Sequence, residues 1–361
     1  MKAVILVGGK ATRMLPLTYN APKAMLPVLN TPFLEHVIHH LSSHRVKDII
    51  LAQGHLAQSI EGYLGDGSRL GVSLRYVVED NPLGTAGAIK NTESYIDESC
   101  LVLNGDIFTD LDISAMIKYH QERGAKATIA LTPVDDPTSY GLIETDSDGR
   151  VARFVEKPDR SEISTNMINA GTYILEPEVL AQIPAQTNVS IERETFPQLL
   201  AQGKPVYAYS APTYWIDIGT PEKYLELHSN LLRGEVSRYT LAPDNEVLFG
   251  KQSHVHPTSR ITAPVVVGDN CSIGSNVELK GPMVIGHGSS ILEDSVIESS
   301  IIWQNVQIGA RVHLRKSIVA DNCRIDSDSI VAGSILGDDV TVVSGCKVSP
   351  GSKIEPGTTV T

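Results

Sequence analysis

The sequence predicts an α/β domain with a mostly parallel sheet, followed by a parallel β-helix. Residues 1 to about 230 alternate short apolar runs with helical patterns, which is typical of βαβ units. From about residue 261 apolar residues recur every six positions instead, and a hexapeptide repeat is typical of a parallel β-helix. We therefore expect a first domain over residues 1–230, a linker over 231–250 and a β-helix over 251–361.

The strands of the first domain are expected where short apolar runs are bounded by turn residues. Thr31-Pro32 and Thr220-Pro221 each place a capping threonine before a proline suited to the first helical position, so each predicts a helix start. Ligands bind at the carboxyl ends of strands in such sheets, which makes the residues that follow strands candidates for function. The expected strands are VILV, DIILA, LRYVV, CLVLNGD, TIAL, FVEK, TYIL, VYAYS and YWIDI.

In the second half, one apolar residue per hexad is expected to point into the core and to stack on its neighbours. Glycine often follows this residue and permits a tight corner. The spacing slips by one residue three times, and three hexads per turn would give about six coils. The inward positions are Ile261, Val267, Ile273, Leu279, Ile285, Ile291 and Ile297, then Ile302, Ile308 and Leu314, then Val319, Ile325 and Val331, then Leu336, Val342, Val348, Ile354 and Val360.

Charge and composition narrow the classes of partner. The net charge of −12 over 361 residues argues against a nucleic-acid partner and against binding to an anionic membrane surface. No apolar run reaches the length of about 18 residues that crossing a membrane requires. The four cysteines lie far apart, and the amino terminus has a strand pattern instead of a secretory signal. We therefore expect a cytoplasmic protein with reduced thiols.

The amino-terminal strand ends in a glycine pair that is followed by cationic and hydroxyl side chains. Gly8 and Gly9 let the backbone approach a ligand closely, and their amides can hold phosphate oxygens. Thr12 adds a hydroxyl donor, and Arg13 adds a planar guanidinium suited to phosphate. The segment Pro22-Lys23 brings a second cation ten residues later. Together these residues predict a phosphate-binding loop.

GGKATRMLPLT followed by APKAMLPV resembles the signature of the sugar-1-phosphate nucleotidyltransferases, the nucleotide-sugar pyrophosphorylases. The resemblance covers the whole first half and implies a Rossmann-like catalytic domain. The hexapeptide tail fits a large branch of this family, which implies a left-handed β-helix. The further matches are NPLGTAGAI at 81–89, LNGDI at 103–107, YGLI at 140–143, FVEKP at 154–158, NAGTYIL at 169–175, SIERETFP at 190–197 and WIDIGTP at 215–221.

The chain departs from the family pattern at two positions. Ala11 stands where the family usually has glycine, and Ala24 where it usually has proline. A positive φ at Ala11 would cost about 1 kcal/mol or more. We instead expect a slightly reshaped loop, in which the amide contact of Ala11 with the substrate is altered.

The resemblance implies that a sugar 1-phosphate attacks the α-phosphorus of a nucleoside triphosphate and releases pyrophosphate. The attacking phosphate is largely ionised at neutral pH, because the second pKa of a phosphate monoester is about 6, so no general base is needed. Catalysis then requires cations and positioning. The resemblance assigns Arg13 and Lys23 to the triphosphate and the leaving pyrophosphate, and assigns one Mg²⁺ to Asp106 and Asp217.

The resemblance also implies two groups of binding residues. One group would bind the nucleotide and the other the sugar 1-phosphate. Among the residues for the sugar 1-phosphate, Lys157 would bind the phosphate, while Glu156 and Asn169 would hydrogen-bond the sugar hydroxyls. The nucleotide group comprises Leu6, Gly8, Gly9 and Thr12 as the cradle, with Gly84 and Thr85 at the base edge and Gln53 and Glu79 as candidate neighbours. The sugar-phosphate group comprises Gly141, Glu156, Lys157, Asn169 and Gly171.

The variable segment GTAGA resembles that of the guanylyltransferases that make GDP-mannose, so GTP and mannose 1-phosphate are the favoured substrates. Glucose 1-phosphate with dTTP, UTP or ATP is the alternative. A catalytically silent homologue that binds a nucleotide sugar is another, although the cationic and acidic residues named above are all present. The tail histidines 254, 256, 287 and 313 also leave an acyltransferase open. We expect a homo-oligomer formed through the β-helix.

Histidines 36, 40 and 44 follow one another at intervals of four residues and share one helical face. This spacing could suit a zinc ion, but packing or solvation of a helix face is the interpretation we favour.

Overall fold

The computed structural model describes residues 1–9, 11–54, 56–236 and 246–361. The chain forms two compact units, and each is described by itself. The first contains residues 1–10 and 34–217, and the second contains residues 11–33 and 218–361. Segment 11–33, which carries the predicted phosphate-binding cations, thus belongs to the unit that contains the β-helix. Part of the predicted linker, residues 237–245, lies outside the described residues.

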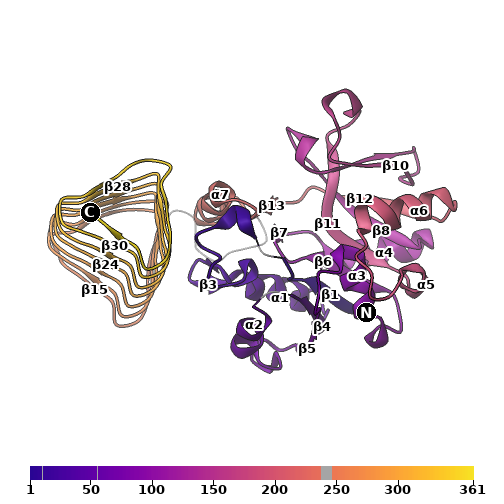
Figure 1. The fold of residues 1–361 in the computed structure, drawn as a ribbon, viewed down its shortest axis with the longest axis horizontal. Coiled ribbons are helices and arrows are strands. Elements are labelled where there is room, and N and C mark those ends of the chain that lie inside the picture. Colours follow the sequence, from indigo (N-terminus) through magenta and orange to yellow (C-terminus); the bar gives the residue numbers. More distant parts are fainter. Residues whose placement is uncertain (10, 55, 237–245) are drawn as a thin grey trace. The chain divides into compact units, whose positions relative to one another are not determined.

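The first unit is built around a mixed sheet, which confirms the predicted α/β class (Figure 1). Strands β6, β1, β4 and β5 are parallel, whereas β11 pairs antiparallel with β6 and with β8. Each apolar run that predicted a strand lies on one. In spatial order the sheet contains β10 (Val151–Glu156), β9 (Gly141–Thr145), β11 (Met167–Leu175), β6 (Cys100–Asn104), β1 (Lys2–Leu6), β4 (Asp48–Gln53) and β5 (Ser73–Val78), while β8 (Ala127–Pro133) and β12 (Val206–Ser210) continue from β11.

Two short ribbons and several helices complete the region before the β-helix. The ribbons pair β7 (Ile107–Thr109) with β13 (Trp215–Asp217), and β2 (Pro27–Val28) with β3 (Thr31–Pro32). The helices are α1 (Phe33–Ser43), α2 (Ala57–Leu64), α3 (Gly84–Asn91), α4 (Ile113–Arg123), α5 (Pro177–Gln182), α6 (Phe196–Ala201) and α7 (Pro221–Leu232). Shorter helical turns are η1 (Thr12–Met14), η2 (Lys23–Met25), η3 (Ser68–Leu70), η4 (Glu93–Tyr95), η5 (Pro137–Ser139), η6 (Arg160–Glu162) and the π-turn η7 (Ile191–Thr195).

One of the two predicted helix starts is confirmed, and the other is wrong. Thr220 caps α7 through its side chain, which accepts from the Lys223 amide at 3.4 Å, and Pro221 occupies the first turn. Thr31 and Pro32 instead form strand β3, since Thr31 pairs with Val28, and the helix begins immediately afterwards. Among the described helices, none combines the length and apolar character needed to cross a membrane.

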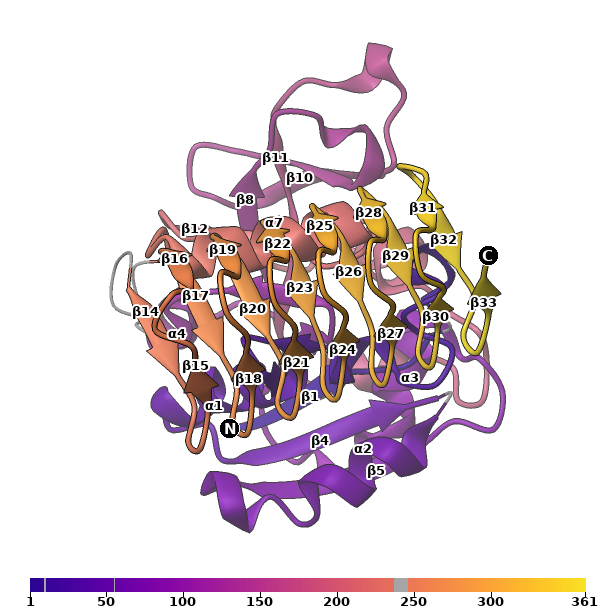
Figure 2. The ribbon, with the colours of Figure 1, turned by 90° about the vertical axis from the view of Figure 1, so that its left-hand side faces the viewer.

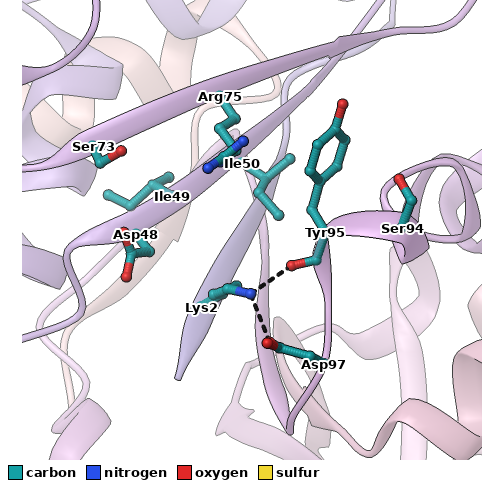
Figure 3. A pocket seen from close by; sticks show the side chains of 9 residues that line it. All are labelled: Lys2, Asp48, Ile49, Ile50, Ser73, Arg75, Ser94, Tyr95 and Asp97. Carbon is teal, nitrogen blue, oxygen red and sulfur yellow. Dashed lines mark hydrogen bonds and ion pairs between the residues drawn. The ribbon is translucent and has the colours of Figure 1, made fainter.

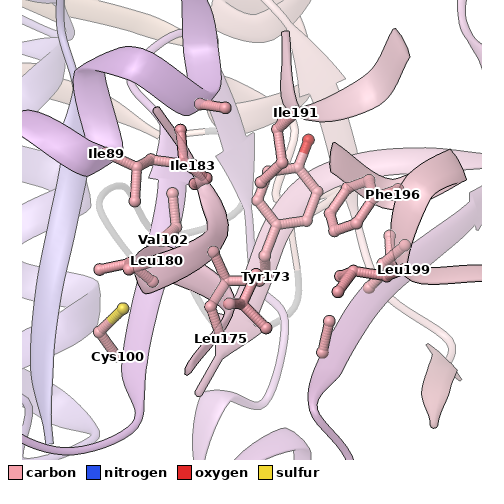
Figure 4. Packing of buried hydrophobic residues seen from close by; sticks show 14 of the residues in the cluster. Ile89, Cys100, Val102, Tyr173, Leu175, Leu180, Ile183, Ile191, Phe196 and Leu199 are labelled. Carbon is pink, nitrogen blue, oxygen red and sulfur yellow. The ribbon is translucent and has the colours of Figure 1, made fainter. Parts of the chain in front are cut away.

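The core beside β11 centres on Tyr173, which is fully buried (Figure 4). Its ring packs edge-on against Phe196 at a centroid distance of 5.2 Å, and Asn169 Nδ2 donates to its hydroxyl oxygen at 2.8 Å. Burial raises the pKa of the Tyr173 hydroxyl well above its usual range. The hydroxyl therefore serves as a fixed neutral partner at the edge of the core, where Asn169 is a predicted sugar-binding residue.

Residues 247–361 form a left-handed β-helix of three parallel sheets (Figure 2). The first sheet contains β14 (Val247–Phe249), β17 (Val265–Val267), β20 (Met283–Ile285), β23 (Ile301–Ile302), β26 (Ile318–Val319), β29 (Ile335–Leu336) and β32 (Lys353–Ile354). The second contains β15 (His254–Val255), β18 (Ser272–Ile273), β21 (Ser290–Ile291), β24 (Gln307–Ile308), β27 (Arg324–Ile325), β30 (Thr341–Val342) and β33 (Thr359–Val360). The third contains β16 (Arg260–Thr262), β19 (Glu278–Lys280), β22 (Val296–Glu298), β25 (His313–Arg315), β28 (Ile330–Ala332) and β31 (Lys347–Val348).

The predicted inward positions lie in or against one continuous apolar core, which confirms the hexapeptide pattern. The three slips are coils shortened by one residue at the same corner. The residues at that corner, Ser299, Lys316 and Gly333, have φ values of 46°, 46° and 55°. The inward rows nevertheless continue in one core across the three shortened corners.

Candidate active site

The strand ends of the first unit bring several predicted nucleotide-binding residues together. A Cβ on Gly8 would lie 3.2 Å from Glu79 Oε1, and a Cβ on Gly54 would lie 3.1 Å from the same oxygen. Glu79 is held there because its Oε2 accepts from the Leu83 amide at 3.1 Å. The two glycines therefore leave room for a carboxylate directly beside the carboxyl end of β1.

Gln53, at the end of β4, has an unusual environment. The residue is only 2 % exposed, yet neither its Oε1 nor its Nε2 has a hydrogen-bond partner within the described residues. A buried polar group without a partner costs about 1–3 kcal/mol. Its backbone oxygen accepts from the Glu79 amide at 2.9 Å, so Gln53 and Glu79 lie on neighbouring strand ends. This cost would be offset by a ligand that hydrogen-bonds the Gln53 side chain.

The turn that carries Asp106 is bonded to the glycine-bearing strand. The Gly105 amide donates to the Leu6 oxygen at 2.9 Å, so Leu6, predicted as part of the nucleotide cradle, joins β1 to this turn. The antiparallel ribbon places Asp217 opposite Ile107, the residue after Asp106. The two predicted metal ligands thus lie on adjacent chain segments. Two carboxylates suit Mg²⁺, which usually keeps waters and takes phosphate oxygens as its other ligands.

The predicted sugar-phosphate residues gather around β9, β10 and β11. A Cβ on Gly141 would lie 2.9 Å from Glu156 Oε2, and the Lys157 amide donates to the Tyr140 oxygen at 2.9 Å. Lys157 itself has a φ of 54°, an uncommon backbone conformation that marks a constrained position. These bonds hold Glu156 and Lys157 at the start of the same turn, beside Gly141.

Asn169 and Gly171 connect the sugar-phosphate residues to the Asp106 strand. The Asn169 Oδ1 accepts from the Gly171 amide at 2.9 Å. Gly171 has a φ of 70°, and a Cβ there would lie 2.8 Å from Asn104 Nδ2. Any larger residue would displace Asn104, two residues before Asp106. Gly171, in the middle of β11, is therefore packed against Asn104 at the carboxyl end of β6, close in sequence to the predicted metal ligand Asp106.

Glu192, on the π-turn, is a candidate functional residue that the sequence interpretation missed. Its Oε2 accepts from the Thr85 hydroxyl at 2.7 Å and from the Ser190 hydroxyl at 2.8 Å. Burial raises the pKa of Glu156, and the charge of Glu192 raises it further. Glu192 lies within SIERETFP, and that match was the only signal in the sequence, because no spacing rule brings a residue a hundred positions away to Thr85.

The contacts of Thr85 limit the hydrogen bonds that its hydroxyl could make to a nucleotide base. Its only hydroxyl proton is donated to Glu192, while its oxygen accepts from the Ile191 amide at 2.8 Å. The side chain is therefore left with acceptor capacity alone. The preceding Gly84 has a φ of 69°, and a Cβ on it would lie 2.6 Å from the Val189 oxygen. Glycine at position 84 is required by this close approach of two backbones.

Thr12, Arg13 and Lys23 belong to the second unit, where η1 and η2 carry them. The expected reshaping at Ala11 is wrong, because Ala11 adopts the left-handed conformation itself, with φ 44° and ψ 43°. Its oxygen accepts from the Met14 amide at 2.9 Å and from the Thr18 hydroxyl at 3.1 Å. These bonds stabilise a conformation that glycine would adopt without strain. Gly9, with a φ of 104°, already has such freedom.

A cavity of about 320 Å³ lies at the opposite, amino-terminal ends of β1, β4 and β5 (Figure 3). Lys2 Nζ bonds there to the Tyr95 oxygen at 2.8 Å and to Asp97 Oδ1 at 2.6 Å, while Arg75 lies over the Tyr95 ring. Ligands of such sheets bind at the carboxyl ends of strands. The polar groups that bond one another in this cavity therefore contribute to structure and are separate from the candidate site.

The three spaced histidines, of which His36 and His40 lie on α1 and His44 directly follows it, make packing and hydrogen-bond contacts, as the favoured interpretation predicted. His40 Nε2 lies 2.9 Å from the Leu111 oxygen, and His44 Nδ1 lies 2.9 Å from Ser114 Oγ. His36 packs against the Phe108 ring at 6.1 Å. In the described part of the chain, no group of three or more His, Cys, Asp or Glu side chains is arranged to hold a metal ion. The four cysteines are free thiols.

This chain is similar to known families and proteins over most of its length. Residues 2–234 match the family model described as nucleotidyl transferase, and residues 278–361 match the left-handed β-helix domain of the EIF2B epsilon subunit. A mannose-1-phosphate guanylyltransferase of Mycobacterium tuberculosis is 35% identical over 85% of this chain and 81% of its own. A UTP–glucose-1-phosphate uridylyltransferase of Synechocystis is 33% identical over 90% and 89%. The structure of HddC from Yersinia pseudotuberculosis complexed with GMP-PN has a TM-score of 0.55 and 32% identity, and covers 63% of this chain and 97% of that one.

Proposed function

Because the chain belongs to the nucleotidyl transferase family and is a sugar-1-phosphate nucleotidyltransferase, we propose that its substrates are GTP and mannose 1-phosphate. The products would be GDP-mannose and pyrophosphate. One observation carries the choice of nucleotide, namely the Glu79 carboxylate held beside Gly8 and Gly54 at the strand ends.

The hydrogen-bonding edge of guanine fits a carboxylate better than the edges of the other bases do. An ionised carboxylate only accepts hydrogen bonds, and guanine presents two adjacent donors, N1–H and the N2 amino group. Uracil and thymine present one donor between two carbonyl oxygens, which would repel a carboxylate. Thr85, limited to accepting, has the same preference for donors. Gln53 could supply a donor to the guanine O6 from its unsatisfied amide.

The names of the relatives support the same choice without deciding it. The Mycobacterium relative is named for mannose 1-phosphate and guanylyl transfer, and the Yersinia structure contains GMP-PN. The Synechocystis relative is named for glucose 1-phosphate and uridylyl transfer, so glucose 1-phosphate with UTP is the second candidate. Five further relatives, from Pichia angusta, Candida albicans, Debaryomyces hansenii, Hypocrea jecorina and Emericella nidulans, are named mannose-1-phosphate guanyltransferase and are 31–35% identical to this chain.

The proposed roles of the residues follow from the charges of the two substrates. Arg13 and Lys23 would bind the triphosphate and offset the charge that develops on the leaving pyrophosphate. Lys157 would bind the sugar phosphate and orient its oxygen toward the α-phosphorus. No residue needs to remove a proton, because the attacking phosphate is already ionised at neutral pH. Glu156 and Asn169 would hold the sugar through its hydroxyls.

We further propose a divalent cation between Asp106 and Asp217, because the β7–β13 ribbon pairs Asp217 with Ile107, the residue after Asp106. Asp106 and Asp217 would hold Mg²⁺, which would reduce the repulsion between the two anionic substrates when bound. We also propose a homo-oligomer formed through the β-helix and a cytoplasmic location. Removal of the metal with a chelator tests the cation. Light scattering of the purified protein tests the oligomer, and cell fractionation tests the location.

The test of the function is pyrophosphate release in a matrix of five nucleoside triphosphates against mannose, glucose, galactose and glucosamine 1-phosphates, with Mg²⁺. Dominant turnover of GTP with mannose 1-phosphate would support the proposal. Dominant turnover of UTP with glucose 1-phosphate would replace it with the second candidate. A folded protein that binds GDP-mannose but releases no pyrophosphate with any pair would be a regulatory homologue instead.

A further inference from the structure

We propose that Tyr224 of α7 and Trp303 of the β-helix are positioning residues for the segment that carries Arg13 and Lys23. The inference rests on the proposed function, because it assigns these two cations to the triphosphate. It adds a role for the β-helix in the reaction itself. All of the residues involved lie in the second unit.

A chain of two hydrogen bonds links the β-helix to the segment. Trp303 Nε1 donates to the Tyr224 hydroxyl oxygen at 3.2 Å, and the Tyr224 hydroxyl in turn donates to the Pro27 carbonyl oxygen. Tyr224 is fully buried and Trp303 is 4 % exposed, so the bond between them is shielded from solvent, while Pro27 is half-buried. Burial also raises the pKa of the Tyr224 hydroxyl, which keeps it a donor at every physiological pH.

Further contacts hold the same segment along successive coils of the solenoid. Asn30 Nδ2 donates to the Ile285 oxygen at 3.0 Å, and Asn20 Nδ2 donates to Asp338 Oδ2 at 2.8 Å. Ile285, Trp303 and Asp338 lie at or just after the ends of β20, β23 and β29, strands of one sheet (Figure 2). The segment therefore lies along one edge of the β-helix, and its contacts span several coils.

A second residue of α7, His228, bonds both the segment and the backbone of Tyr224. The His228 Nε2 accepts from the Leu29 amide at 3.3 Å, and its Nδ1 lies 2.9 Å from the Tyr224 backbone oxygen. Since Nε2 accepts, Nδ1 carries the proton and donates to that oxygen. His228 is 2 % exposed. The turn between β2 and β3 is thus held from two sides by buried, directional bonds.

The position of Pro27 determines the position of Lys23. The Leu26 amide donates to the Lys23 oxygen at 3.1 Å, and Leu26 in turn accepts from the Phe33 amide at 3.0 Å. Turn η2 therefore ends directly at the bonded strand pair β2–β3, and a shift of Pro27 would carry Lys23 with it. A displacement of about 1 Å in a positioning element can reduce the rate of an enzyme about 100-fold.

The test compares three variants of the full-length protein in the GTP and mannose 1-phosphate reaction. Tyr224→Phe removes both bonds and leaves the Pro27 oxygen and the Trp303 N–H unpaired, whereas Trp303→Phe leaves the bond to Pro27 in place. Ser295→Ala is the matched control. It removes a buried hydroxyl that donates to the Gly309 oxygen at 2.8 Å and accepts from the Val312 amide at 3.0 Å, so both bonds that are lost lie within the β-helix.

We expect kcat/KM for GTP to fall about tenfold or more in Tyr224→Phe and about threefold in Trp303→Phe, with KM for mannose 1-phosphate within about twofold of wild type. Ser295→Ala should keep both constants within about twofold of wild type. Equal losses in Ser295→Ala and Tyr224→Phe would show a general loss of stability and would overturn the proposal. Unchanged constants in Tyr224→Phe would overturn it as well.

Hydrogen exchange of the amides of residues 22–33 provides a readout that does not depend on turnover. Exchange should be faster in Tyr224→Phe than in wild type and unchanged in Ser295→Ala. If the wild-type protein turns over no substrate pair, the proposed function fails, and this measurement alone decides whether the β-helix positions the segment. Exchange in Tyr224→Phe equal to wild type would reject the inference whatever the activity.

Discussion

Glu79→Gln should change which nucleotide the enzyme prefers. The glutamine oxygen can keep the bond to the Leu83 amide that Glu79 Oε2 now accepts at 3.1 Å. Its amino group would then occupy the position of Oε1, beside Gly8 and Gly54. An acceptor for the two guanine donors would become a donor, which would be repelled by guanine N1–H and N2–H and would suit the carbonyl oxygens of uracil or thymine.

The size of the effect follows from the bonds exchanged. A pair of hydrogen bonds to a base edge contributes about 1–3 kcal/mol to discrimination, which corresponds to about 5- to 150-fold in kcat/KM. We therefore expect kcat/KM for GTP to fall by about 10- to 100-fold. The ratio of kcat/KM for GTP to kcat/KM for UTP should fall further, because the new donor also suits uracil. The assay is pyrophosphate release at saturating mannose 1-phosphate with each nucleotide varied.

Asp48→Asn is the control for the loss of one negative charge. Asp48 is exposed at the amino end of β4, on the edge of the sheet opposite Glu79, so its substitution should leave the nucleotide ratio unchanged. A GTP-to-UTP ratio in Glu79→Gln that equals the wild-type ratio would refute the assignment of Glu79 to the base. A ratio that changes equally in Asp48→Asn would show that net charge, and no base contact, is responsible.

Three further predictions test the remaining groups of residues. Asp106→Ala and Asp217→Ala should each reduce Mg²⁺-dependent turnover by at least about 100-fold. Their thermal unfolding temperatures should stay near that of wild type. Wild-type rates in either variant would contradict the metal assignment. The pKa of Glu156 is raised in the folded protein, so its ionisation above the unfolded pKa of about 4.5 lowers stability. Glu156→Gln should therefore be more stable than wild type at pH 7, less active with mannose 1-phosphate, and no more stable below about pH 4. Ala11→Gly should increase the free energy of unfolding by about 1 kcal/mol in a urea titration, and a decrease would show that Ala11 is unstrained.

The β-helix was the part of the fold that the sequence predicted in most detail. Its six-residue period identifies the inward residues directly, and even the three slips have a structural counterpart in the corner at Ser299, Lys316 and Gly333. Most strands of the first unit coincide with predicted apolar runs for the same reason, since local pattern determines them, but β7 and β9 were not predicted. Thr31-Pro32 was misinterpreted because a local hairpin forms there instead of a helix start. Leu29 and Asn30, with φ values of 48° and 65°, make a two-residue turn that pairs Thr31 with Val28.

The candidate site was predictable only in part. Motif resemblance named Asp106 and Asp217, and the ribbon of β7 and β13 places them on adjacent segments. It did not reveal that the proton of Thr85 is committed to Glu192, because that bond joins residues 107 positions apart. Nor did it anticipate the conformation of Ala11, where bonds from Met14 and Thr18 hold a backbone that local preference disfavours.

The long separation between segment 11–33 and its partners has a consequence for how the protein is made. Asn20 and Asp338 are 318 residues apart, and Asn30 and Ile285 are 255 apart. At the usual rate of about 5–20 residues per second, the ribosome needs roughly 15–60 s to add the residues that separate each pair. During that interval the segment lacks the solenoid partners of Asn20 and Asn30, and its Leu26 and Val28, which are buried in the folded protein, belong to a segment that is not yet held in place. Nascent chains should therefore bind chaperones through this segment, and release should coincide with completion of the solenoid.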